Sequence, residues 1–196
     1  MSQIDELIVR NRAWASGKVR VDPAFFSRLV AQQNPQFLWI GCADSRVPAN
    51  EIVGLDPGEL FVHRNIANLA TPGDLNYLSV LQYSVEVLKV RHILVVGHYG
   101  CGGVRAAMED VDHGLMDNWI APIRSLARDF AAELATIADP HARHDRLTEL
   151  NVLRQVRLVA ETPVMVKARK AGVAPDIHAW CYGISDGLVV DLTGTG

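Results

Sequence analysis

The fold of this chain is decided by two apolar runs, Phe37-Leu38-Trp39-Ile40-Gly41 and His92-Ile93-Leu94-Val95-Val96-Gly97. Both runs are predicted to be buried strands. Each is followed at once by a polar motif, Cys42-Ala43-Asp44-Ser45-Arg46 after the first and His98-Tyr99-Gly100-Cys101-Gly102-Gly103 after the second. In open α/β sheets, sites are built at the carboxyl ends of strands. The two motifs are therefore expected to meet at one edge of a sheet.

The remaining patterns extend this core into one α/β domain over residues 1–196. Helices are expected over 4–15 and 23–33, with a break at Ser16-Gly17-Lys18 between them, and over 74–90, 117–137, 141–161 and 162–169. Further strands are expected over 60–63, 177–182 and 188–192. The expected fold is a mostly parallel central sheet of four or five strands, flanked by helices and closed by a hairpin. Residues 1–35 form an N-terminal helical arm whose apolar side chains need a surface to cover.

Composition excludes several classes of protein. Nearly half of the 196 residues are hydrophobic and the net charge is −3, as in an ordinary soluble protein without a nucleic-acid footprint. No apolar stretch reaches the roughly 20 residues of a membrane span. The N-terminus has no secretory signal pattern, and three cysteines do not make a disulfide framework. We therefore expect a cytoplasmic protein with no nucleic-acid or membrane partner.

Cys42, His98 and Cys101 have the character of metal ligands. Two thiolates and one imidazole suit a single zinc ion, with one position that opens to water. The long gap between Cys42 and His98 and the short gap to Cys101 are typical of a catalytic zinc site assembled from two strand ends. Cys101 is expected at a helix N-terminus, which favours its thiolate. For any one of them alone, a buried structural role is the better interpretation. The other six histidines, at 63, 92, 113, 141, 144 and 178, are interpreted as surface or core residues.

Asp44 and Arg46 follow the first ligand closely enough to share its chemistry. A carboxylate beside a metal can ligate it or can accept a hydrogen bond from a metal-bound hydroxide. A guanidinium beside that carboxylate can hold it through two hydrogen bonds and keep it ionised. The alternative is a turn aspartate paired with an arginine for local order.

These motifs resemble those of the β-class carbonic anhydrases. The resemblance also covers 57–68 and 182–187, and so spans nearly the whole chain. It implies one zinc ion per chain held by Cys42, His98 and Cys101, and reversible hydration of carbon dioxide to bicarbonate and a proton. It also implies dimers that often pair into tetramers. Further residues are placed at the catalytic site by the same resemblance: Asp44 and Arg46 as the orienting pair, Gly102 as an amide donor to substrate, Gln33 as a residue reaching into a partner's site, and Tyr83 as an aromatic near the cleft.

A narrower resemblance points to the bacterial subgroup with a second, non-catalytic bicarbonate site. It rests on Trp39, Gly41, Val47-Pro48-Ala49, Arg64 and Tyr182. It implies that bicarbonate separates Asp44 from Arg46, so that Asp44 closes onto zinc as a fourth ligand. Activity is then expected to fall below about pH 8, because hydroxide competes with Asp44 for the same metal position.

Two other functions stay open at this point. The same scaffold could hydrolyse carbon disulfide or carbonyl sulfide, since access to the metal is not visible in the sequence. A non-catalytic zinc or bicarbonate sensor is the other alternative, although it would not require Asp44 and Arg46.

Overall fold

The computed structural model describes residues 2–31 and 33–194, which divide into two compact units at Asn34. The first unit holds helices α1 (Gln3–Val21) and α2 (Phe25–Ala31). Ser2 caps α1 through a capping box with Asp5, and Asp22, which precedes Pro23, leaves the helical conformation and ends it. The expected break at Ser16-Gly17-Lys18 is wrong, because one interior glycine costs a helix only about 1 kcal/mol.

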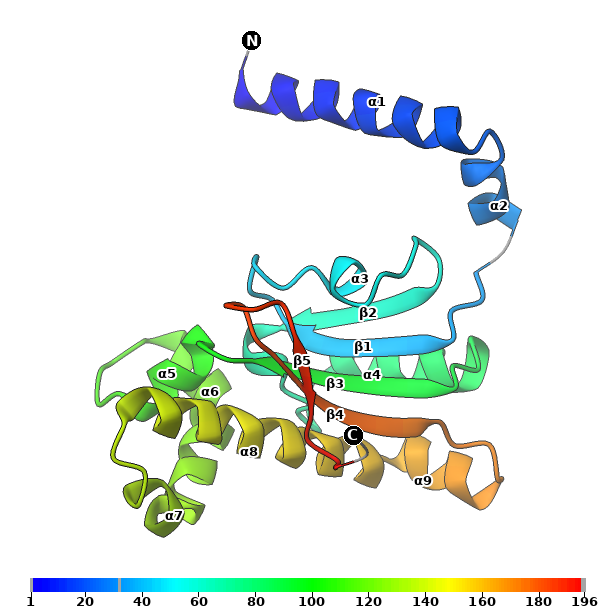
Figure 1. The fold of residues 1–196 in the computed structure, drawn as a ribbon. Helices are drawn as coiled ribbons and strands as arrows, with labels where there is room; N and C mark the ends of the chain where they lie inside the picture. Colours follow the sequence, from blue (N-terminus) through cyan, green and yellow to red (C-terminus); the bar gives the residue numbers. More distant parts are fainter. Residues whose placement is uncertain (1, 32, 195–196) are drawn as a thin grey trace. The chain divides into compact units, whose positions relative to one another are not determined.

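The second unit, from Pro35 onward, is built on a five-stranded sheet in the order β2-β1-β3-β4-β5 (Figure 1). The strands are β1 (Phe37–Cys42), β2 (Leu60–Asn65), β3 (His92–His98), β4 (Asp176–Tyr182) and β5 (Val189–Asp191). The first four are parallel, and β5 returns antiparallel to β4. The predicted fold class, a mostly parallel sheet flanked by helices, is confirmed.

Helices and short turns connect these strands. They are α3 (Ala49–Ile52), the 3₁₀ turn Ile66–Asn68, α4 (Leu75–Gln82), the π-helical turn Tyr83–Val87, α5 (Gly102–Met108), α6 (Leu115–Asp129), α7 (Ala131–Ala135), α8 (Pro140–Glu161) and α9 (Pro163–Lys170). The single helix expected over 117–137 is divided at Phe130, which leaves the helical conformation. The helix expected over 74–90 changes to π-helical geometry at Tyr83. No described helix is both long and apolar enough to cross a bilayer.

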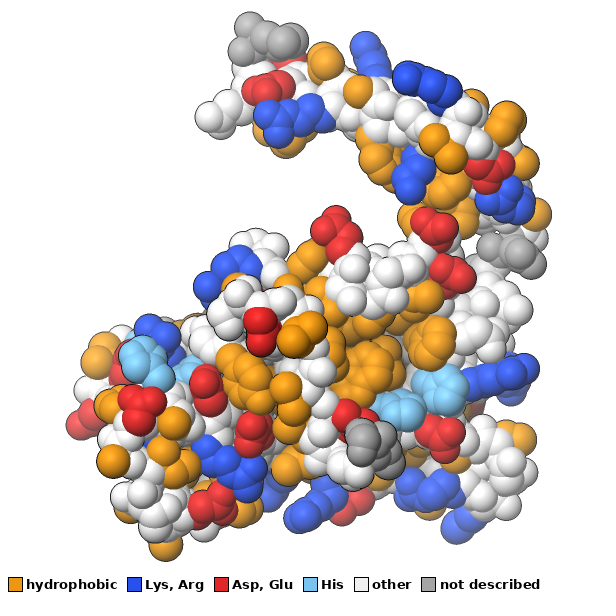
Figure 2. Space-filling view, in the orientation of Figure 1, with side chains coloured by type: hydrophobic (Ala, Val, Ile, Leu, Met, Phe, Trp, Pro, Cys, Tyr) orange, Lys and Arg blue, Asp and Glu red, His pale blue; other side chains and the backbone are white. Residues whose placement is uncertain are grey.

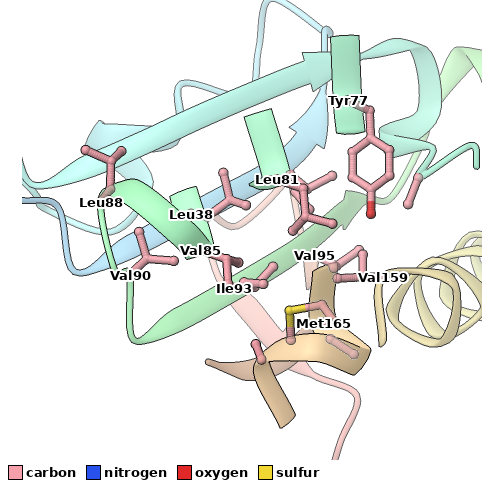
Figure 3. Close-up of a cluster of buried hydrophobic side chains, with 14 of the residues drawn as sticks. Leu38, Tyr77, Leu81, Val85, Leu88, Val90, Ile93, Val95, Val159 and Met165 are labelled. Atoms are coloured by element: carbon pink, nitrogen blue, oxygen red, sulfur yellow. The ribbon is translucent and has the colours of Figure 1, made fainter. Parts of the chain in front are cut away.

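The main core lies between the sheet and the helices α4, α8 and α9 (Figure 3). Leu38 and Ile40 of β1 and Ile93 and Val95 of β3 point to this face and are fully buried. The alternate residues of the same strands point to the other face, where Trp39, Leu94 and Val96 pack against α3 and its flanking loop. Both faces of the central strands are thus apolar, which explains their uninterrupted hydrophobic sequence.

The strand order places a topological switch point between β1 and β3. From β1 the chain first adds β2 on one side, and it then returns to add β3 on the other side. At such a point the connections that leave the two strands diverge, which opens a crevice at their carboxyl ends. The two polar motifs occupy this position.

The space-filling view shows that the sheet is not covered evenly. In Figure 2 an apolar patch lies at the surface of the second unit, with histidine side chains beside it. Leu188 and Val190 near the β5 edge are strongly exposed, while Trp180 and Tyr182 of β4 are half-buried.

Candidate metal centre

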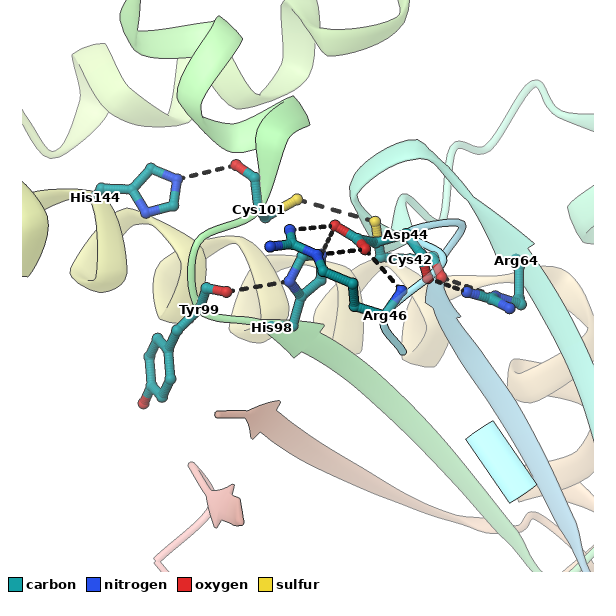
Figure 4. A network of polar contacts seen from close by, with 8 residues as sticks. All are labelled: Cys42, Asp44, Arg46, Arg64, His98, Tyr99, Cys101 and His144. Carbon is teal, nitrogen blue, oxygen red and sulfur yellow. Dashed lines mark hydrogen bonds and ion pairs between the residues drawn. The ribbon is translucent and has the colours of Figure 1, made fainter. Parts of the chain in front are cut away.

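Three potential ligands meet at the switch point (Figure 4). Cys42 is the last residue of β1, His98 is the last residue of β3, and Cys101 is the N-cap of α5. Their ligand atoms all lie within 4.8 Å of one another, and all three residues are buried. The sequence prediction that these residues come together is therefore matched by the structure.

The two sulfur atoms are spaced for a metal and not for a disulfide. Cys42 Sγ and Cys101 Sγ are 4.0 Å apart, whereas a disulfide bond is about 2.05 Å long. Two thiolates bound at about 2.3 Å to one tetrahedral zinc ion lie about 3.8 Å apart. The observed separation is close to that value.

The imidazole of His98 provides a second, independent test of the fit. Its Nδ1 lies 3.1 Å from the carbonyl oxygen of Tyr99. Because a carbonyl can only accept, Nδ1 carries the proton and Nε2 presents a lone pair. Nε2 is fully buried and has no hydrogen-bond partner within the described part of the chain. A buried nitrogen without a partner is costly in a folded protein, and a metal ion beside the two sulfurs removes that cost.

The backbone around the two thiols favours negative charge on sulfur. The backbone N–H groups of Asp44 and Ala67 act to lower the pKa of Cys42, and those of Gly103 and Val104 act in the same direction on Cys101. The contact between the two thiols is the main cause that lowers the pKa of Cys42, and the same contact together with burial raises the pKa of Cys101. A bound divalent cation deprotonates coordinating thiols outright.

Asp44 lies beside the ligand set and is held in place by Arg46. The guanidinium donates from Nε to Oδ1 at 3.0 Å and from a terminal nitrogen to Oδ2 at 2.7 Å, and the Arg46 backbone N–H donates to Oδ1 at 2.9 Å. The Arg46 hydrogen bond is the main reason why the pKa of Asp44 lies well below its usual range. Asp44 Oδ2 is 3.7 Å from His98 Nε2. The ionised carboxylate thus faces the place where the ligand atoms converge.

A second anion site was predicted from four residues, Trp39, Gly41, Arg64 and Tyr182. Arg64 of β2 donates to the backbone carbonyls of Cys42 and Asp44, the first at 2.8 Å. The indole of Trp39 lies against Gly41, where a Cβ would come within 2.1 Å of Nε1. Trp39 Nε1 is buried without a hydrogen-bond partner in the described residues. Tyr182 packs, half-buried, against the cluster that contains Trp39.

The other three predicted residues are Gln33, Tyr83 and Gly102. Gln33 is exposed and belongs to the first unit, whereas the ligand set belongs to the second. Tyr83 is 43% exposed, and its ring is 5.8 Å from that of Phe61. Gly102 opens α5 and a Cβ there would meet nothing within 4 Å, so neither packing nor turn geometry demands this glycine.

Sequence reasoning missed the residues that hold the turn after β2, which lies next to Cys42. Ala67 and Asn68 adopt positive φ angles of 62° and 49°. Asn151 of α8 donates to the carbonyl of Ala67 at 3.0 Å, and Gln155 donates to the Asn151 side chain at 2.8 Å. Two buried amides four residues apart on the apolar face of a helix were the available signal. They hold the turn whose N–H reaches Cys42.

Known proteins are similar to this chain in sequence and in fold. The model of the carbonic anhydrase family matches residues 37–189. A carbonic anhydrase of Emericella nidulans is 48% identical over 188 residues, which are 96% of this chain and 82% of that relative.

Solved structures agree with the sequence relatives. A tetrameric β-carbonic anhydrase of Sordaria macrospora has a TM-score of 0.92 at 37% identity, over 96% of each chain. A β-carbonic anhydrase of Coccomyxa, solved with acetazolamide, has a TM-score of 0.93 at 36% identity, over 98% of this chain and 87% of that one.

Proposed function

This chain belongs to the β-class carbonic anhydrase family, and from that premise we propose roles for its individual residues in the hydration of carbon dioxide. The family uses zinc, and we assign the zinc ligands to Cys42, His98 and Cys101. The observation that carries the assignment is the buried, unpartnered Nε2 of His98 within 4.8 Å of both sulfur atoms.

In the proposed mechanism this chain's residues orient the reactants. Cys42, His98 and Cys101 would hold the zinc ion, which would supply a Lewis acid that lowers the pKa of a water molecule to about 7. Asp44 accepts a hydrogen bond from the attacking hydroxide and turns its lone pair toward the carbon of CO2. Arg46 keeps Asp44 ionised and aimed through its two hydrogen bonds. The Gly102 amide donates to a substrate oxygen, at a position where no side chain narrows the approach.

The proposed orienting role is tested by two substitutions. We expect Asp44→Asn and Arg46→Ala to keep one zinc ion per chain but to lower kcat/KM by about a hundredfold or more, because misplaced reactants cost that much. Glu133→Gln removes the charge from another arginine–carboxylate pair, in which Arg146 Nε lies 2.6 Å from Glu133 Oε1 and which is far from the site in sequence. It serves as the matched control and should retain activity. Stopped-flow CO2 hydration and zinc analysis on the same samples decide the question. Near-normal turnover in both variants would leave the pair a purely structural role.

We also propose that bicarbonate and low pH favour an inactive state in which Asp44 leaves Arg46 and turns onto zinc. Trp39 Nε1 is a buried donor without a hydrogen-bond partner among the described residues, and it lies close to the backbone of Gly41; this unpartnered donor supports an anion site there. Asp44 already lies near the ligand set, so a small rotation suffices. An anion that binds the inactive state more tightly must shift the population toward it.

Trp39→Phe tests this regulation because it removes the donor and keeps an aromatic ring. Bicarbonate inhibition should weaken while zinc content is unchanged. Trp180→Phe, which alters a half-buried indole on the same face, is the matched control. Unaltered inhibition and an unaltered pH profile in Trp39→Phe would rule out this pocket.

We propose that the active form is a dimer or a tetramer. No residue of α1 is buried, and Ile4, Leu7 and Ile8 are exposed; the Sordaria macrospora relative is tetrameric. Gln33 and Tyr83 would then act in a cleft shared between two copies. Light scattering across a dilution series, with activity measured on each fraction, tests the assembly; an active monomer would exclude it.

The place of action and the alternative substrates are proposals as well. Three free, buried cysteines fit a reducing compartment, and we propose the cytoplasm, testable by cell fractionation. Carbon disulfide and carbonyl sulfide should be assayed beside CO2; we expect CO2 to be the preferred substrate.

A further inference from the structure

A pair of histidines faces each other at the edge of the sheet opposite the zinc ligands. His92 is the first residue of β3, and His178 lies on β4 in parallel register with Leu94. Because side chains alternate between the two faces of a strand, His92 and His178 project from the same face. Their ring nitrogens, Nδ1 of His92 and Nε2 of His178, are 3.2 Å apart. The mechanism proposed above uses neither residue.

A carboxylate lies beside His92 and would have to turn toward His178 to complete the group. Asp176 is the register partner of His92 on β4, so it projects from the same face. Its Oδ2 lies 3.8 Å from Nδ1 of His92. The Asp176 side chain is 79% exposed and that of His92 is 35% exposed. The carboxylate is therefore free to turn, and the His92 ring is partly open to solvent.

We propose that His92, His178 and Asp176 form a second metal site, which binds a late first-row divalent cation such as Ni²⁺, Cu²⁺ or Zn²⁺. Two imidazole nitrogens bound to one tetrahedral zinc ion at 2.0–2.1 Å lie about 3.3 Å apart, close to the spacing in this pair. Imidazole is the ligand that these cations favour, and a carboxylate and water complete such sites. The prediction that both histidines are only surface or core residues is the alternative that the experiment below must exclude.

The geometry distinguishes this site from the zinc centre. The zinc centre is buried and combines two thiolates with one imidazole, whereas this site is half-exposed and has no sulfur. Without thiolates we expect it to bind more weakly and to exchange its metal with solvent. Trp180 lies on the same strand, with its ring 6.2 Å from that of His178. Its fluorescence reports on a paramagnetic ion bound there.

The test uses the full chain with its catalytic zinc in place and with any affinity tag removed. Titration with NiCl2 is followed by calorimetry, by Trp fluorescence and by metal analysis after equilibrium dialysis. We expect one saturable nickel ion per chain in addition to the zinc ion. His92→Gln and His178→Gln should each weaken nickel binding by more than about tenfold, since even outer partners of a metal ligand contribute 10- to 100-fold. Asp176→Asn should weaken it less.

His113→Gln is the matched control. His113 also lies beside a carboxylate, with its Nε2 3.6 Å from Glu109, but the structure pairs it with no second imidazole. This variant should bind nickel like the wild type. Far-UV circular dichroism and retention of the single catalytic zinc ion show that each variant is folded. The absence of a saturable second metal in the wild type overturns the proposal, and so does equal binding by His178→Gln and the wild type. Either result would leave the pair as a hydrogen bond between two rings.

Discussion

The two ends of β3 carry the same residue type in opposite environments. His98, at the carboxyl end, is fully buried, and its outward nitrogen has no partner among the described residues. His92, six positions earlier, is half-exposed and shares its nitrogen with His178. The strand gives both rings a fixed direction, but only the carboxyl end lies at the switch point where two thiols also converge. The surroundings of a histidine, more than the residue itself, therefore determine which metal chemistry it can serve.

The largest contrast between the two ends should be in zinc content. His98→Gln should lose most of its zinc and with it nearly all CO2 hydration, because one of three protein ligands is removed. His92→Gln should retain the catalytic zinc ion. Metal analysis after dialysis against a mild chelator measures both. If His98→Gln kept a full complement of zinc, the assigned ligand set would be wrong.

A smaller effect is expected behind the zinc centre, at Asn151. Asn151→Ala removes the donor to the Ala67 carbonyl and leaves buried polar groups unpaired. The free energy of unfolding should fall by about 1–3 kcal/mol, and zinc should dissociate faster because the N–H that supports Cys42 is no longer fixed. Asn118→Ala, at an exposed position of α6, is the control. Denaturant unfolding and a chelator competition assay report the two effects; unchanged zinc release would limit Asn151 to a structural role.

The two glycines after Cys101 should also behave differently. A Cβ at Gly103 would lie 2.7 Å from Ile66 Cγ2 and 3.1 Å from Ala67 Cβ, whereas one at Gly102 would meet nothing within 4 Å. Gly103→Ala should therefore destabilise the fold by about 1–3 kcal/mol through overpacking. Gly102→Ala should not destabilise it, and any loss of kcat/KM in that variant is then a direct effect on the approach of substrate. Thermal unfolding of the two proteins side by side makes the comparison.

The smallest effect concerns a third histidine, His63 of β2. Burial lowers the pKa of His63 in the folded protein, so the unfolded chain binds its proton more readily. The neutral, buried His63 therefore contributes to the free energy of unfolding. This contribution is fully present above the pKa of His63 in the unfolded chain, about 6.5, and is lost as the pH falls toward the lower pKa of His63 in the folded protein. Through His63 the free energy of unfolding changes by at most about 1.4 kcal/mol per pH unit. His63→Gln should flatten the dependence of unfolding free energy on pH between about 7 and 5; identical slopes in both proteins would contradict it.

The sequence by itself predicted the fold class and the three candidate metal ligands that the structure brings together. The apolar runs from Phe37 and His92 are continuous because both faces of a central parallel strand are buried, and this pattern is visible without a structure. The ligand motifs directly follow those runs, so their meeting at one sheet edge could be predicted from strand ends alone. Predictions of where helices begin and end, which rest on single residues such as glycine, were less accurate. Gly17 did not stop α1, since one glycine is a small cost in a long helix.

Only the tertiary structure decided which neighbours the ligands and histidines have. Ala67 and Asn151 are 84 residues apart in the sequence, and His92 and His178 are 86 apart. Their contacts depend on how α8 packs against the turn after β2 and on which strand lies next to β3. Pair distances of this kind follow from the register of the sheet and the packing of its helices, which no periodicity within one segment encodes.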